Sequence, residues 1–123
     1  MRTIIAGSRK CDNMKEVEFA IKTCNFIITT VISGNAKGVD RLGEIWAIKN
    51  KIPLKRFPAD WNKYHKSAGY IRNEEMANNA DALIAVWDGY SKGTEHMINI
   101  AKQKNLKIYV HYIGSKENNI LCV

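Results

Sequence analysis

Short apolar runs alternate with amphipathic segments along most of this chain. Five runs have the length and the apolar or β-branched content of buried strands, namely residues 3–6, 29–33, 53–57, 82–87 and 106–112. Between them, apolar residues recur three and four positions apart, which predicts helices over 14–24, 39–50, about 67–79, and from 94 past 101. The polar and aromatic segment 60–66 shows neither pattern, and we expect an irregular connection there.

This alternation of strands and helices is typical of a parallel sheet covered by helices on both faces. Right-handed crossovers and a switch point between the first and fourth strands give the expected strand order 3-2-1-4-5. We therefore predict an α/β, Rossmann-like, doubly wound fold with five mainly parallel strands. Residues 1–113 are expected to form one domain, and 114–123 a C-terminal tail in which 120–123 is a candidate for a short extra strand.

Three of the predicted strands end in turns rich in glycine and hydrogen-bond donors. In the expected order, the turns after strands one, two and four lie at one carboxyl edge and converge on one crevice. A helix that follows such a turn offers free backbone N–H groups and a partial positive charge, and glycine lets a phosphate approach the backbone. The candidate phosphate-binding or ligand-binding residues in these turns are Gly7, Ser8, Arg9, Ser33, Gly34, Lys37, Gly38, Asp40, Asp88, Gly89, Ser91, Lys92, Gly93 and Thr94.

Several of these residues are also explained by a structural role alone. Gly34 and Gly38 suit the geometry of a turn, and Asp40 could hold its loop or cap a helix instead of bonding a ribose hydroxyl. Asp88 fits an Asx-turn as well as a ligand contact. We expect Thr94 to be the N-cap of its helix, with a hydroxyl that can also donate to a phosphate. The second turn does not match GxxxxGK[ST], which disfavours a Walker-type triphosphate site.

An arginine and an asparagine lie inside the third predicted helix. Arg72 shares a face with Met76, so it is either a ligand-binding side chain or a long side chain whose stem packs on apolar surface. Asn73 follows it and is a further binding candidate. The aromatic and histidine cluster just before this helix either stacks on a nucleobase or packs the crossover, and we favour packing for Trp61, Tyr64, His65 and Tyr70.

Composition narrows the classes of function. The 123 residues carry a formal net charge of +7, which suits a nucleotide or nucleic acid, although scattered lysines also serve solubility alone. Three cysteines without a CxxC pair favour free thiols in a reducing compartment. No apolar run reaches the roughly 20 residues of a membrane span and no signal-peptide pattern is present, so we expect a soluble, cytoplasmic protein without membrane contact. The histidines lack partners at the spacing of metal ligands, so we expect no metal ion. We expect no cofactor either.

Six segments together resemble the small YspA-like branch of the SLOG superfamily, whose relatives include the Lonely Guy phosphoribohydrolases and DNA-processing protein A. These segments, between residues 5 and 98, are AGSR, SGNAKGVD, PADW, AGYIRNEEM, ADALIAVWDG and SKGTEHMI. The resemblance implies a Rossmann-like domain that binds a nucleotide or a nucleotide derivative. Gly93 and Thr94 resemble the phosphate-binding end of the Lonely Guy PGGxGTxxE motif, whose glutamate position is Met97 here. Arg72 and Met76 are similar to the RxxxM element that contributes the catalytic arginine of that family.

Three functions follow from these features. The first is a binding module for a nucleotide or its derivative, acting as a sensor or a sequestering protein, because the donor-rich turns lack an evident catalytic carboxylate. The second is a phosphoribohydrolase or ribosyl-transfer enzyme with Arg72 as its catalytic residue and Glu95, Asp88 or Asp40 as its acid. The third is binding of single-stranded nucleic acid, which the positive charge and the DNA-processing relatives favour less strongly. We also expect a homo-oligomer.

Overall fold

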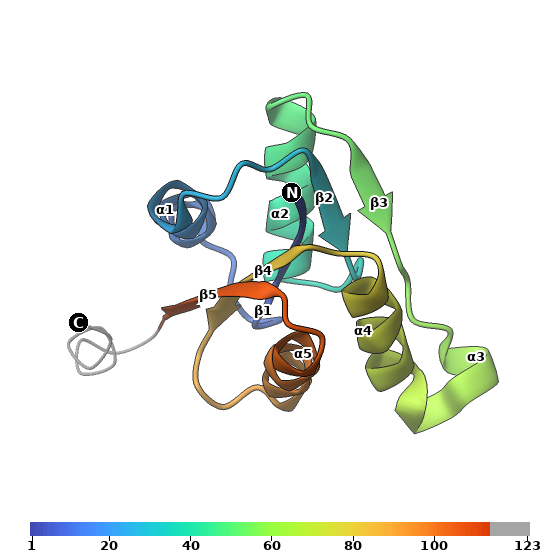
Figure 1. Cartoon of the computed structure of the whole chain (residues 1–123). Helices are drawn as coiled ribbons and strands as arrows, with labels where there is room; N and C mark the ends of the chain where they lie inside the picture. Colours follow the sequence, from blue (N-terminus) through green and yellow to red (C-terminus); the bar gives the residue numbers. More distant parts are fainter. Residues whose placement is uncertain (114–123) are drawn as a thin grey trace.

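A sheet of five parallel strands forms the centre of the molecule (Figure 1). The computed structural model describes residues 1–113. The strands are β1 (Arg2–Gly7), β2 (Thr30–Ser33), β3 (Leu54–Arg56), β4 (Ala82–Trp87) and β5 (Lys107–Tyr112), in the order β3-β2-β1-β4-β5. All four pairings are parallel, so the predicted fold class and strand order are confirmed. The predicted tail at 114–123, with its candidate strand, lies outside the described residues.

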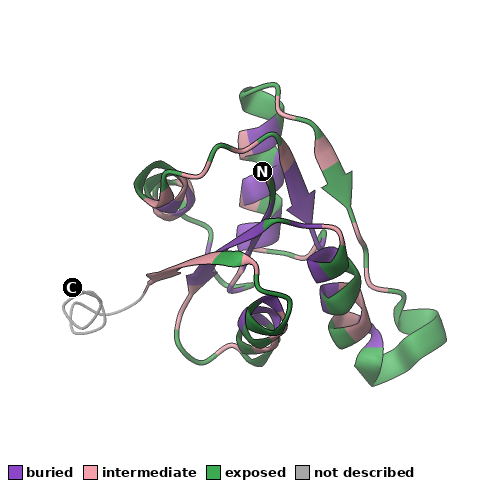
Figure 2. Cartoon of the chain, viewed as in Figure 1, coloured by how far each residue is buried: buried purple, intermediate pink, exposed green. Residues whose placement is uncertain are grey.

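Two pairs of helices cover the two faces of this sheet. Helices α1 (Met14–Cys24) and α2 (Val39–Lys49) pack on one face. Helices α4 (Ala68–Asn78) and α5 (Lys92–Gln103) pack on the other. In Figure 2 the buried residues lie on the central strands and on the helix sides turned toward them.

Adjacent residues of the central strands enter opposite halves of the core. Ile4 of β1 belongs to the cluster under α4 and α5, while Ile5 belongs to the cluster under α1 and α2. Leu83 and Ile84 of β4 divide in the same way, and all four side chains are fully buried. A strand that is covered on both faces needs apolar residues at every position, which explains the uninterrupted apolar runs in the sequence.

The segment predicted to be irregular contains a short helix, and that prediction was wrong. Helix α3 (Trp61–Tyr64) is followed by a single 3-10 turn, η1 (His65–Ser67). Asp60 starts α3, because its carboxylate accepts a hydrogen bond from Lys63 N at 3.1 Å. A helix of four residues is too short to show a recurring apolar face, so periodicity could not detect it.

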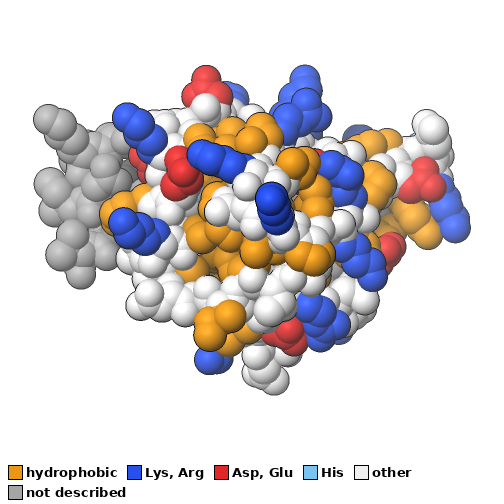
Figure 3. All heavy atoms as spheres, turned by 90° about the horizontal axis from the view of Figure 1, so that it is seen from above, with side chains coloured by type: hydrophobic (Ala, Val, Ile, Leu, Met, Phe, Trp, Pro, Cys, Tyr) orange, Lys and Arg blue, Asp and Glu red, His pale blue; other side chains and the backbone are white. Residues whose placement is uncertain are grey.

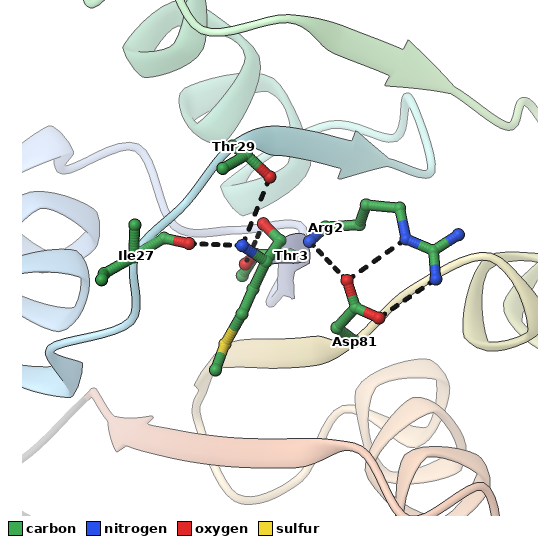
Figure 4. Close-up of polar contacts among 6 residues, drawn as sticks. Arg2, Thr3, Ile27, Thr29 and Asp81 are labelled. Atoms are coloured by element: carbon green, nitrogen blue, oxygen red, sulfur yellow. Dashed lines mark hydrogen bonds and ion pairs between the residues drawn. The ribbon is translucent and has the colours of Figure 1, made fainter.

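The amino edge of the sheet is held by polar contacts around the start of β1 (Figure 4). Asp81 accepts hydrogen bonds from Arg2 N at 2.8 Å and from the Arg2 guanidinium at 3.0 and 3.2 Å. The amino group of Met1 donates to the carbonyl of Ile27 and to the hydroxyl of Thr29. These contacts stabilise the amino edge of the sheet. The donor-rich turns all lie at the opposite, carboxyl edge.

Candidate functional site

The turns after β1, β2 and β4 lie together at the carboxyl edge of the sheet. A cavity of about 230 Å³, which we call the inner hollow, opens between them and is also lined by α4 and α5. The turn residues that line it are Gly7, Arg9, Ala36, Asp40, Ser91, Gly93 and Thr94. The convergence expected from the strand order is therefore present in the structure.

Ser8 does not line the inner hollow, because it is buried and joins the turns to one another. Its N–H donates to the Val86 carbonyl at 3.0 Å, and its hydroxyl accepts a bond from Asp88 N at 3.1 Å. Its carbonyl accepts a bond from Val39 N at 3.2 Å, at the start of α2. Its N–H, its carbonyl and its hydroxyl oxygen all bond within the protein, so Ser8 holds the first turn against the other two.

Gly38 is required by the backbone of the second turn. Its φ of +77° lies in the region that favours glycine, and a Cβ there would stand 2.3 Å from the Ser8 carbonyl oxygen. Gly34 instead lies against two charged side chains. A Cβ on Gly34 would stand 2.5 Å from Arg72 Nη1 and 2.8 Å from Asp40 Oδ2, so both groups fill the space that a side chain at this position would need.

Ser33, also a candidate, belongs to a buried polar chain rather than to the inner hollow. Its hydroxyl donates to Glu44 Oε2 at 2.7 Å and accepts a bond from Asn35 N at 3.0 Å. Glu44 in turn forms an ion pair with Arg56 of β3 at 2.9 Å. These contacts connect β2, α2 and β3, which explains a hydroxyl and a carboxylate in the interior.

Asp40 is the buried acid of the inner hollow. Its side chain is only slightly accessible, with 5% of the residue exposed, and Oδ2 accepts a hydrogen bond from Ala36 N at 3.2 Å. Burial raises the pKa of Asp40 to about 6, although the Ala36 hydrogen bond and the charge of Arg72 act in the opposite direction. Asp40 therefore changes its charge close to neutral pH while it supports the second turn.

Arg72 and Asn73 form a polar bridge between the second and third turns. Arg72 Nη1 donates to the Gly34 carbonyl at 2.5 Å, and Nε donates to Asn73 Oδ1 at 3.1 Å. Asn73 Nδ2 reaches the Gly93 carbonyl at 3.2 Å and contacts His96 Nδ1 at 3.1 Å. The guanidinium is thus held at the hollow by contacts within the protein instead of extending into solvent.

The third turn places the start of α5 at the inner hollow. Asp88 Oδ1 accepts hydrogen bonds from Tyr90 N and Ser91 N, both at 2.8 Å, in the Asx-turn that the sequence allowed. Ser91 is the N-cap, so the prediction that Thr94 caps this helix was wrong. The Asx-turn of Asp88 starts α5 at Lys92, earlier than Gly93 in the sequence indicates. Thr94 therefore lies in the first turn of α5.

The first N–H groups of α5 are free for a ligand. Within residues 1–113, those of Lys92, Gly93 and Thr94 have no hydrogen-bond acceptor, and the Ser91 side chain makes no capping bond. Gly93 is also sterically open, because a Cβ there would meet no atom within 4 Å. A phosphate oxygen could therefore approach this backbone directly, in the field of the helix dipole. Lys92 and Gly89 are exposed beside this turn and do not line the hollow.

Aromatic side chains form the rim of the inner hollow. Trp61 and Tyr70 line it with 49% of each residue exposed, whereas Tyr64 and His65 of the same cluster do not line it. The Arg9 guanidinium lies 5.9 Å from the centre of the Trp61 ring, and Tyr70 stacks on His96 with ring centres 4.4 Å apart. Base stacking was the less favoured of the two roles considered for Trp61 and Tyr70, although their position just before Arg72 was a usable signal.

The three candidate acids are in different environments. Glu95 lies at a separate hollow beside Trp87 and Tyr112, and Asp88 is occupied by its own turn. Asp40 remains as the acid at the inner hollow. Met97, at the position of the Lonely Guy glutamate, is buried and contributes an apolar wall. In the part of the chain that the structure describes, no three His, Cys, Asp or Glu side chains gather as a metal site would require.

No helix between residues 1 and 113 combines the length and the apolar character needed to cross a membrane. The amphipathic helices described above instead turn their apolar sides to the sheet.

Comparison with known proteins identifies relatives of this chain. The profile described as the YspA, cpYpsA-related SLOG family matches residues 1–64. Gene 61 protein of Mycobacterium phage D29 is 31% identical over 84 residues, which are 63% of this chain and 67% of that protein. DNA processing protein A from Streptococcus pneumoniae has a similar fold, with a TM-score of 0.74 and 18% sequence identity over 94% of this chain. The chain spans about half of that protein, 51% of its length. Since the family profile matches more than half of it, the chain belongs to the YspA, cpYpsA-related SLOG family.

Proposed function

We propose that residues 1–113 are a single binding domain for a nucleotide or a nucleotide derivative, and that the ligand occupies the inner hollow. One observation carries the proposal. The unoccupied N–H groups at the start of α5 lie at the same hollow as Arg72, Arg9 and the exposed ring of Trp61. An anion, a sugar and a flat apolar base need this combination of donors, positive charge and aromatic surface.

Each part of a nucleotide has a matching part of the hollow. The phosphate group fits the start of α5, where Gly93 leaves the backbone open and the helix dipole favours an anion. The base fits against Trp61 at the rim, where about half of this residue is exposed and Arg9 adds positive charge. The sugar between them lies near Asp40 and Asn73, which line the hollow from the first turn of α2 and from α4.

The test combines a ligand screen with a substitution that separates binding from stability. The wild type is titrated calorimetrically with the common nucleoside monophosphates and with ADP-ribose, and thermal unfolding is recorded in parallel, since a bound ligand stabilises the folded state. Gly93→Ala should fold at least as well as the wild type, because its Cβ enters open space and alanine favours a helix by up to about 1 kcal/mol. It should nevertheless bind the best ligand at least tenfold more weakly.

Asn99→Ala is the matched control for this substitution. It also raises helix propensity in α5, but Asn99 lies at the separate hollow beside Trp87. This variant should bind as the wild type does. No stabilisation of the wild type by any ligand at millimolar concentration, or unchanged binding by Gly93→Ala, would contradict the proposal.

A second candidate function is cleavage of the N-glycosidic bond of a nucleoside monophosphate, and Asp40 favours it. This reaction needs a group that stabilises an oxocarbenium-like state or protonates the departing base. Asp40 faces the inner hollow with a pKa of about 6, which suits an acid near neutral pH. Chromatography should detect free base with the wild type and none with Asp40→Asn. Absence of free base from all the common nucleoside monophosphates would rule this function out.

A further inference from the structure

A second cavity adjoins the inner hollow on the side of the second turn. This outer hollow has a volume of about 440 Å³. It shares four of its lining residues with the inner hollow, which are Arg9, Ala36, Trp61 and Arg72. The two cavities therefore adjoin each other at Arg9, Trp61 and Arg72, and we call the two together the groove.

The outer hollow carries positive charge without a carboxylate in its lining. Lys37 and Arg41 line it together with the shared Arg9 and Arg72. None of these four side chains forms an ion pair within residues 1–113, whereas Arg2 and Arg56 each pair with a carboxylate. On the face shown in Figure 3, by contrast, Lys and Arg side chains are scattered among apolar and neutral ones.

The two arginines that line both hollows, Arg9 and Arg72, repel each other. Burial is the main cause that lowers the pKa of Arg72, and the charge of Arg9 acts in the same direction, so the two guanidinium groups are close enough to repel each other. Asp40 offsets part of this repulsion from the inner side, but its own charge is reduced near pH 6. An anion bound in the groove would relieve the repulsion, which makes this stretch more favourable for phosphate than for a neutral group.

We propose that the groove binds a nucleotide in which one nucleoside carries phosphate groups on both its 5′ and 3′ sides. The first phosphate lies at the start of α5, the nucleoside lies beside Trp61, and the second phosphate lies between Lys37 and Arg41. The inference rests on the proposed function, because the first phosphate and the base occupy the inner hollow as described there. This chemistry occurs in nucleoside 3′,5′-bisphosphates, in short linear dinucleotides and in longer single strands.

Calorimetry on the full chain separates these cases. Nucleoside 5′-monophosphates, the matching 3′,5′-bisphosphates, 5′-phosphorylated dinucleotides and oligonucleotides of increasing length are titrated into three proteins. These are the wild type, the double variant Lys37→Ala/Arg41→Ala, and the control Lys22→Ala/Lys49→Ala, which removes the same charge from exposed helix positions. All three should unfold at similar temperatures, because all four side chains are exposed.

The second phosphate should strengthen binding to the wild type at least tenfold, in the bisphosphate and the dinucleotide alike. The double variant should lose this gain and bind the monophosphate within about twofold of the wild type, while the control keeps the gain. Affinity should not rise further with longer oligonucleotides.

Three results would overturn the inference. In the first, the wild type binds monophosphate and bisphosphate equally, which leaves the proposed function intact. In the second, the double variant loses as much affinity for the monophosphate as for the bisphosphate, which means that the outer hollow binds no phosphate of its own. In the third, affinity rises steadily with strand length, as on an extended nucleic-acid surface. If no ligand binds at all, the proposed function fails as well.

Discussion

Replacing Asp40 by asparagine should change how the stability of this protein depends on pH. Asp40 is buried at the inner hollow, and its pKa in the folded protein is about 6, compared with 3.8 for an ordinary aspartate. The folded state therefore holds a proton that the unfolded state releases. The resulting stabilisation is complete below about pH 4, decreases as pH rises, and is lost above about pH 6.

The size of this pH-dependent stabilisation follows from the pKa shift of Asp40. A difference of about two pKa units, at about 1.4 kcal/mol per unit, gives roughly 3 kcal/mol. Asparagine has a similar shape, and its carbonyl oxygen can accept the hydrogen bond from Ala36 N, but it cannot ionise. The difference in unfolding free energy, Asp40→Asn minus wild type, should thus grow by roughly 3 kcal/mol in favour of the variant between pH 4 and pH 7.

Urea unfolding at half-unit steps of pH, followed by tryptophan fluorescence and circular dichroism, measures this difference. Asp81→Asn is the matched control. The Arg2 guanidinium lowers the pKa of Asp81 to about 2, so its contribution is present above pH 4 and is lost only below it. The Asp81→Asn difference should be constant from pH 5 to pH 7, and small, because the pair is exposed. A constant Asp40→Asn difference over the same range would refute the reasoning about its burial.

Three further substitutions test the framework of the site by urea unfolding and ligand titration. Ser8→Ala leaves the N–H of Asp88 without its acceptor and should cost about 1–3 kcal/mol; a loss below 0.5 kcal/mol would contradict the joining role. Gly38→Ala, at a φ of +77°, should cost more than about 1 kcal/mol, whereas an unchanged midpoint would contradict the required backbone conformation. Arg72→Gln removes the guanidinium bond to Gly34 and should weaken nucleotide binding at least tenfold, which unaltered affinity would disprove.

The order of the strands and the convergence of the turns were predictable because they depend on patterns of several residues. Continuous apolar runs identify strands buried on both faces, and the handedness of crossovers then fixes their order. The fold in turn determines that the turns containing Gly7, Gly38 and Gly93 share one edge. Neither the strand order nor the shared edge depends on where any single side chain points.

The roles of individual polar residues were less predictable. A serine in a donor-rich turn can face a ligand or the backbone, and Ser8 and Ser33 both bond to the protein itself. The start of α5 depends on the Asx-turn of Asp88, which competes locally with the cap expected at Thr94. Trp61 reaches the hollow through a helix too short to leave a periodic pattern, so its position depends on tertiary structure.

Amide chemical shifts recorded by NMR during titration with the best-binding nucleotide show whether the ligand occupies the carboxyl edge of the sheet. Amides of residues 7–9, 34–38 and 91–94 should shift together with one dissociation constant, and those of Gly93 and Thr94 should move most. Amides around Arg2 and Asp81, at the opposite edge of the sheet, should not move. Shifts confined to that edge, or spread without any at the start of α5, would contradict the account.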